Sequence, residues 1–218
     1  MAEEAKTADE KSLELLVAQL GGSHRRGRQE ASRIVAAIAK ASPDAVLPYA
    51  DDLVDALDRP EAQTRWQALE ALTALSAVDA QAASAALDGA EASLFDEDSP
   101  IVRLAAFKFL AALGARSKRL SASVWPLLDE AVQCYHGDPE YRDMLVALVE
   151  FVRGDVSDEV RAALVARALR GACVKLSRRR VGKAHAWALR GRAGNRSWYS
   201  LMRMSQGAGP AGRAWRLK

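Results

Sequence analysis

The sequence predicts an all-α protein, an α-solenoid of about four to five helical hairpins followed by a weakly ordered basic C-terminal tail. First, four arginines recur at intervals of 37, 38 and 39 residues, namely Arg28, Arg65, Arg103 and Arg142. Small or aliphatic residues follow each arginine three, seven and ten positions later, which is the spacing of one apolar helix face. Second, alanine is abundant, and β-branched runs typical of strands do not occur. A helix that returns at this interval buries its apolar side only against neighbouring copies, so the hairpins are expected to stack.

The 218 residues divide into three predicted segments. Residues 1–9 form an acidic lead that is expected to be disordered. Residues 10–176 carry the helical repeats, and residues 177–218 form a basic segment with at most one further helix, over 181–189. The predicted helices of the repeats cover 10–20 and 23–41, 44–57 and 61–76, 79–95 and 99–113, 121–135 and 138–152, and one that starts at 157.

Capping residues and prolines indicate where these helices begin and end. The glycine pair at Gly21 ends the first helix. Pro43 and Pro100 each follow a serine, which is the order of an N-cap residue and a first helical residue. Pro48 lies inside the helix predicted from residue 44. Ser157 is the predicted cap of the last helix in the repeats.

The segment 99–106, Ser-Pro-Ile-Val-Arg-Leu-Ala-Ala, resembles the P-x-V-R-x-x-A signature of HEAT repeats. Asp96 stands seven residues before the arginine of this segment, as Asp58 does before Arg65. The resemblance extends from residue 11 to about residue 176 and implies a solenoid of HEAT-like hairpins. Pro48 resembles the proline that often bends the first helix of a HEAT unit. The resemblance also implies that the four repeat arginines are structural and bond turn carboxylates and carbonyl groups, with Asp58 and Asp96 as partners.

The charge of the chain is divided unevenly between its two ends. Residues 1–159 contain 16 Lys or Arg against 28 Asp or Glu, a net charge of −12, whereas residues 160–218 contain 15 Lys or Arg and no acid. Cations that alternate with aromatic residues suit RNA or single-stranded DNA, because cations neutralise phosphates and aromatic rings stack on bases. The candidate contacts to a nucleic acid or another partner are Arg178, Arg179, Arg180, Lys183, Arg190, Arg192, Trp187 and Trp198.

Two other interpretations of this basic segment stay open. The segment could fold back on the acidic repeats and cap the last of them. Alternatively, its richness in Arg, Gly, Ala and Trp without acids is what a shifted reading frame of a GC-rich gene encodes.

The sequence contains no recognisable catalytic motif, and its histidines, His24, His136 and His185, lack metal-ligand spacing. No catalytic residue, cofactor or metal ion is therefore predicted. The leading hypothesis is a non-enzymatic scaffold or adaptor that binds another protein along its helical array. The alternative is a nucleic-acid-binding protein that uses the basic segment. A remote alternative is an enzyme similar to the HEAT-like DNA-repair glycosylases, whose Trp-Trp-Asp cluster has no match in this chain.

The expected compartment is the cytoplasm. The first residues are acidic and lack the apolar core of a signal peptide, and no stretch of the chain is apolar enough to span a membrane. The two cysteines, Cys134 and Cys173, are expected to be small buried residues of equivalent helices rather than a disulfide.

Overall fold

The computed structural model describes the backbone of residues 2–167 and the side chains of residues 10–167. This part of the chain is helical throughout and contains no strand. Its elements in order are α1 (Ala2–Leu20), α2 (Arg25–Ala41), α3 (Pro43–Val46), η1 (Leu47–Tyr49), α4 (Ala50–Asp55), η2 (Ala56–Asp58), α5 (Ala62–Leu75), α6 (Ala80–Ala83), η3 (Ser84–Ala86), α7 (Leu87–Leu94), α8 (Pro100–Gly114), α9 (Lys118–Cys134) and α10 (Tyr141–Arg153). A further helix begins at residue 158. None of the described helices is both long and apolar enough to cross a bilayer.

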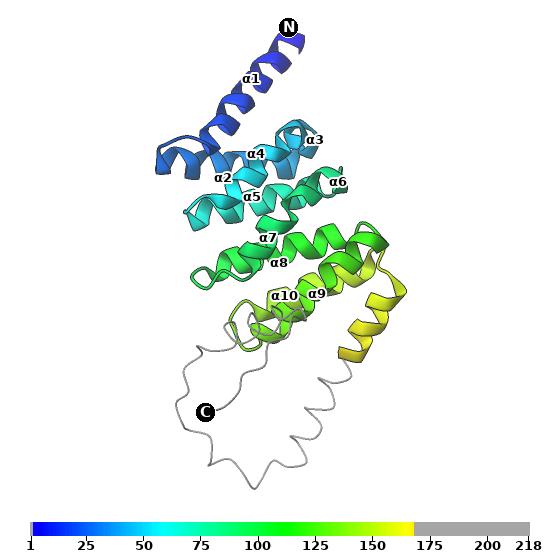
Figure 1. The fold of residues 1–218 in the computed structure, drawn as a ribbon. Helices are drawn as coiled ribbons and strands as arrows, with labels where there is room; N and C mark the ends of the chain where they lie inside the picture. Colours follow the sequence, from blue (N-terminus) through cyan, green and yellow to red (C-terminus); the bar gives the residue numbers. More distant parts are fainter. Residues whose placement is uncertain (1, 168–218) are drawn as a thin grey trace, which may run out of the picture. The chain divides into compact units, whose positions relative to one another are not determined.

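Successive hairpins stack through their second helices (Figure 1). Helix α2 contacts α5, α5 contacts α8, and α8 contacts α10, while α1, α4, α7 and α9 pack beside them as first helices of the hairpins. We call α2, α5, α8 and α10 the second helices, and the exposed surface that they share the second-helix face. The predicted all-α solenoid is therefore confirmed. The described hairpins lie in one compact unit, Met1–Ala168, and the predicted domain boundary at 176 lies outside the described residues.

The apolar stripe of each second helix lies in the core, but the fourth stripe differs from the prediction. The predicted positions of α5 and α8 are fully buried. In α10 the buried residues are Met144 and Phe151, with Leu148 partly buried against the core. Leu145 and Val149, which the arginine spacing placed inside, are 39% and 52% exposed. The prediction for these two residues is wrong, because the helix is rotated by one residue relative to the predicted register.

The first helices also differ from the prediction in their extent and continuity. Helix α1 begins at Ala2, so the helix runs through most of the segment 1–9, which the sequence predicted to be a disordered lead. Alanine, glutamate and lysine dominate this segment, and all three favour helix. Pro48 lies in the 3-10 turn η1, as its bending role predicts. The 3-10 turn η3, Ser84–Ala86, interrupts the next first helix without a proline.

Candidate functional site: a groove on the second-helix face

Three of the repeat arginines join each hairpin to the next, and we call Arg28, Arg65 and Arg103 the arginine ladder. Arg28 donates from Nε to Glu61 Oε2 at 3.1 Å, and its Nη2 donates to the other oxygen of the same carboxylate. Arg65 donates from Nη1 to Asp96 Oδ2 at 2.5 Å. Because each acceptor belongs to the following hairpin, these ion pairs fix the spacing between neighbouring repeats.

Arg103 is the most buried rung of the ladder. Its side chain is 9% exposed and that of its partner Glu140 is 5% exposed. Nε and Nη2 of Arg103 donate to Glu140 Oε1 at 3.1 and 2.5 Å, and Nη1 donates to the carbonyl oxygen of Asp96 at 3.0 Å. The guanidinium carbon lies 4.8 Å from the centre of the Tyr135 ring, which adds a cation–π contact. This arginine therefore bonds both a carboxylate and a turn carbonyl, the pattern that the family resemblance implies.

Arg142 is not a rung of the ladder, so its prediction as a structural repeat arginine is wrong. Its side chain is exposed and forms no ion pair with any residue from 10 to 167. The buried residues of α10 follow their counterparts in α8 by 38 positions, so Tyr141 occupies the position equivalent to Arg103. Asp58 is likewise exposed, and Glu61 accepts the hydrogen bonds of the ladder in its place.

The ladder lowers the pKa of two carboxyl groups. For Glu61 the hydrogen bond from Arg28 is the main cause, and the pKa lies below the ordinary value of 4.5. Burial alone would raise the pKa of Asp96, but the ion pair with Arg65 and two backbone amides outweigh it, and the pKa lies below 3.8. A carboxyl group whose pKa is lower in the folded state stabilises the fold above its unfolded pKa. This contribution is lost as the pH falls through the folded pKa.

We therefore expect the free energy of unfolding to decline as the pH is lowered from about 5 to about 3. Replacing Arg28 with methionine should reduce stability at pH 7 and flatten this decline, because Glu61 then has no cation to protect its charge. The matched control is Arg33→Met, which removes an exposed ion pair with Glu30. Urea titrations at several pH values measure the effect. Parallel curves for the wild type and the Arg28 variant would contradict the prediction.

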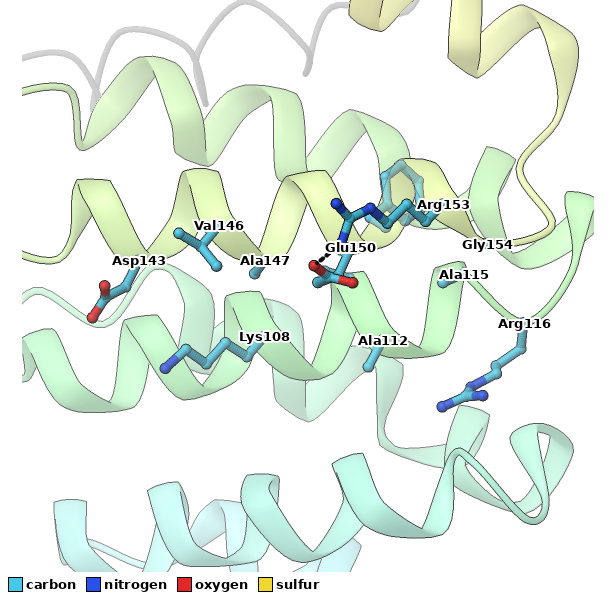
Figure 2. A pocket seen from close by; sticks show the side chains of 12 residues that line it. Lys108, Ala112, Ala115, Arg116, Asp143, Val146, Ala147, Glu150, Arg153 and Gly154 are labelled. Atoms are coloured by element: carbon cyan, nitrogen blue, oxygen red, sulfur yellow. Dashed lines mark hydrogen bonds and ion pairs between the residues drawn. The ribbon is translucent and has the colours of Figure 1, made fainter.

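A groove lies between α8 and α10 on the second-helix face (Figure 2). We call it the α8–α10 groove, and its volume is about 640 Å³. Its lining contains Ala111, Ala112 and Ala115 from α8, and Ala147 and Phe151 from α10. Because an alanine side chain is a single methyl group, the space between the two helices is left open. The ring of Phe151 is 1% exposed, so the accessible apolar surface comes from the alanines and from Val146 of α10, which is 56% exposed.

One end of the groove is fixed by a close approach of two turns. A Cβ atom on Gly154 would lie 2.4 Å from the carbonyl oxygen of Ala115, so only glycine fits at this position. The same carbonyl oxygen accepts a hydrogen bond of 2.8 Å from the amide of Asp155. The turns after α8 and α10 are thereby held together, and the width of the groove is set at this end.

Charged side chains form the rim of the groove. Lys108 extends from α8 and Arg116 from the turn that follows it, while Asp143, Glu150 and Arg153 lie along α10 (Figure 2). Glu150 and Arg153 form an ion pair of 2.6 Å. The lining holds no histidine, cysteine, serine or tyrosine that could act as a nucleophile or a general base. Its small apolar side chains and flanking charges suit the binding of a chain segment.

The candidate nucleic-acid contacts all lie outside the described residues, and they are Arg178, Arg179, Arg180, Lys183, Arg190, Arg192, Trp187 and Trp198. Cys134 is exposed, so its predicted burial is wrong. Among the residues that the structure describes, no three His, Cys, Asp or Glu side chains are grouped closely enough to hold a metal ion. The groove itself was not predicted. The closely spaced alanines of α8, at 111, 112 and 115, were its only signal in the sequence.

Comparison with solved structures supports the fold. An engineered protein solved by a structural genomics consortium superposes with a TM-score of 0.60 at 22% identity, over 71% of this chain and 68% of the other. A designed armadillo repeat protein, solved in complex with the peptide (KR)4, gives a TM-score of 0.57 at 18% identity, over 71% and 69% of the two chains. A chain of the Rix1-Rea1 pre-60S particle gives 0.51 at 15% identity, over 76% and 74%. No protein-family model and no curated protein matches the sequence. The chain is therefore similar to helical repeat solenoids of several kinds.

Proposed function

We propose that this chain is a non-enzymatic scaffold with HEAT-like repeats, which binds a segment of another protein on its second-helix face. The observation that carries the proposal is the α8–α10 groove, an open hollow of about 640 Å³ with a partly apolar lining and a charged rim. A lining of this kind offers contact area and orienting charges, which are the elements of a peptide site.

The solenoid architecture adds support to this proposal. Helix α8 is held between α5 and α10, and α10 packs against α8 and α9, so the groove lies on packed helices and needs little reorganisation to bind. The designed armadillo protein in complex with (KR)4 has a similar fold and holds a peptide. Binding by that protein motivates the proposal for this one, although the likeness in sequence is low.

A substitution that fills the groove tests the proposal. Peptides are first selected from a random library on the full-length wild-type protein. We expect them to bind the Ala112→Arg variant at least about tenfold more weakly than the wild type, because the long arginine side chain occupies the groove. The matched control is Ala122→Arg, which places the same side chain at an exposed position of α9. Affinities are measured by fluorescence anisotropy. Failure to select any peptide, or equal affinities for the two variants, would argue against the groove as a binding site.

Nucleic-acid binding through residues 175–203 is the second candidate function. It is favoured by the composition of this segment, in which cations and aromatic residues alternate and acids do not occur. Electrostatic binding to phosphates weakens steeply with salt. Titration of single-stranded RNA at two salt concentrations, with the full chain and with a chain ending at Ser177, distinguishes this candidate from the scaffold.

A further inference from the structure

Several charged side chains on the second-helix face are paired with one another. Arg33 pairs with Glu30 on α2 at 2.5 Å, and Lys40 of α2 pairs with Glu70 of α5 at 2.7 Å. At the groove, Arg153 pairs with Glu150. Paired charges attract a charged ligand weakly, because each cation is accompanied by an anion at close range. The unpaired charges therefore decide the chemistry of a partner.

Two cations on the rim of the α8–α10 groove are unpaired. Lys108 and Arg116 are exposed, and neither forms an ion pair with any carboxylate among residues 10–167. Both line the groove, one toward each end of its α8 side (Figure 2). Asp143, across the groove on α10, is also without an ion pair among these residues. The α8 side of the groove therefore carries two positive charges that form no ion pair with these residues.

We infer that the α8–α10 groove binds an extended, acidic peptide, with one carboxylate on Lys108 and another on Arg116 and a small apolar residue over the alanine lining. This inference rests on the proposed function and names the class of its partner. Lys108 lies six residues before the end of α8, a rise of roughly 9 Å, and Arg116 lies in the turn that follows, which brings their separation to about 12 Å. An extended chain advances about 3.3 Å per residue, so acidic residues about four positions apart match this distance.

The lining strengthens the selectivity for carboxylates. A peptide that covers the alanines and Val146 excludes water from the rim, and hydrogen bonds between opposite charges are stronger in a less polar environment. The groove thus favours charge opposite to that of the (KR)4 peptide held by the designed armadillo protein. A nucleic acid fits less well. It carries a charge on every nucleotide, more than two separated cations neutralise, and it has no small apolar side chain to cover the alanine lining.

Fluorescence anisotropy with the full-length protein tests this inference. The probe is a labelled alanine-based decapeptide with glutamate at its third and seventh positions, and glutamine and lysine versions serve as matched peptides. We expect the glutamate peptide to bind at least about tenfold more tightly than the glutamine peptide, and the lysine peptide more weakly still. Lys108→Gln and Arg116→Gln should each lower the affinity for the glutamate peptide about fivefold to tenfold. Arg33→Gln, which removes a paired cation on α2, should leave its affinity unchanged.

Three results would overturn the inference. The first is equal binding of the glutamate and glutamine peptides, or no effect of the Lys108 and Arg116 variants. The second is displacement of the glutamate peptide by a thymidine dodecanucleotide. This result counts if the oligonucleotide binds more tightly than the peptide and its affinity falls in the same Lys108 and Arg116 variants. The third is a wild-type dimer in sedimentation experiments that becomes a monomer in the Lys108→Gln variant. The groove would then be occupied by a second copy of the chain.

The library selection separates this inference from the proposed function. If Ala112→Arg blocks the selected peptides while the glutamate and glutamine peptides bind alike, the groove is a binding site without a preference for acids. If Ala112→Arg has no effect and neither decapeptide binds, both the proposed function and the inference fail.

Discussion

Replacing Arg103 with alanine is expected to lower the free energy of unfolding by about 3–5 kcal/mol, the usual cost of removing one partner from a buried ion pair. Its partner Glu140 has a side chain that is only 5% exposed, and Oε2 of this residue already lacks a hydrogen-bond partner among the described residues. Without Arg103 the whole carboxylate would be buried and unpaired. The turn carbonyl of Asp96 would also lose the hydrogen bond from this guanidinium.

Arg142→Ala is the control for this experiment, because the sequence predicts equivalent repeat positions for both arginines while the structure buries only Arg103. Urea denaturation followed by circular dichroism should show a change within about 0.5 kcal/mol for the control. The double variant Arg103→Met with Glu140→Met should recover most of the lost stability, since it leaves no buried charge unpaired. Equal effects of the two single alanine variants would contradict the structural role of the ladder.

The sequence predicts the first three hairpins well because one residue type marks the same position in each of them. Arg28, Arg65 and Arg103 all precede their apolar stripes by three, seven and ten residues, and all three lie in the ladder. The fourth hairpin has tyrosine at this position and an arginine directly after it. The arginine spacing therefore gave a register for α10 that is wrong by one residue.

Hydrophobicity could not correct this error. Helix α10 carries apolar residues on two adjacent stripes, so both Met144 and Leu145 fit a buried position, as do Leu148 and Val149. Only the packing of α10 against α8 and α9 distinguishes the two stripes. Leu145 and Val149 are exposed, whereas their counterparts in α8, Phe107 and Ala111, are buried.

The groove could not be predicted from the sequence, for a different physical reason. Alanine is the strongest helix former, and alanines 111, 112 and 115 indicate helix wherever they face. Whether a methyl group meets a neighbouring side chain or leaves a hollow depends on the residues across the interface, here on α10. The break at Ser84–Ala86 was equally hidden, because no proline or glycine lies within this 3-10 turn. Such features follow from contacts between hairpins, which local patterns do not record.

The register of α10 leads to the second large effect, which is expected for Phe151→Ala. The phenyl ring is 1% exposed and stacks on Trp125 of α9, with ring centres 6.5 Å apart and planes 6° from parallel. It also packs against α8 at Gly114, where an added Cβ would lie 2.9 Å from the ring. Removing the ring leaves a cavity where three helices meet. The expected loss is about 3–5 kcal/mol in the free energy of unfolding.

Val149→Ala distinguishes the observed register from the one that the arginine spacing predicted. In the predicted register Val149 is a core residue, and its truncation to alanine would cost a few kcal/mol through lost burial. In the structure it is 52% exposed on a helix, so the change should stay within about 0.5 kcal/mol, and the higher helix propensity of alanine offsets part of the loss. Urea denaturation of both variants measures the difference. If Val149→Ala were the more damaging substitution, α10 would have to be rotated by one residue, which would turn Phe151 out of the lining of the groove.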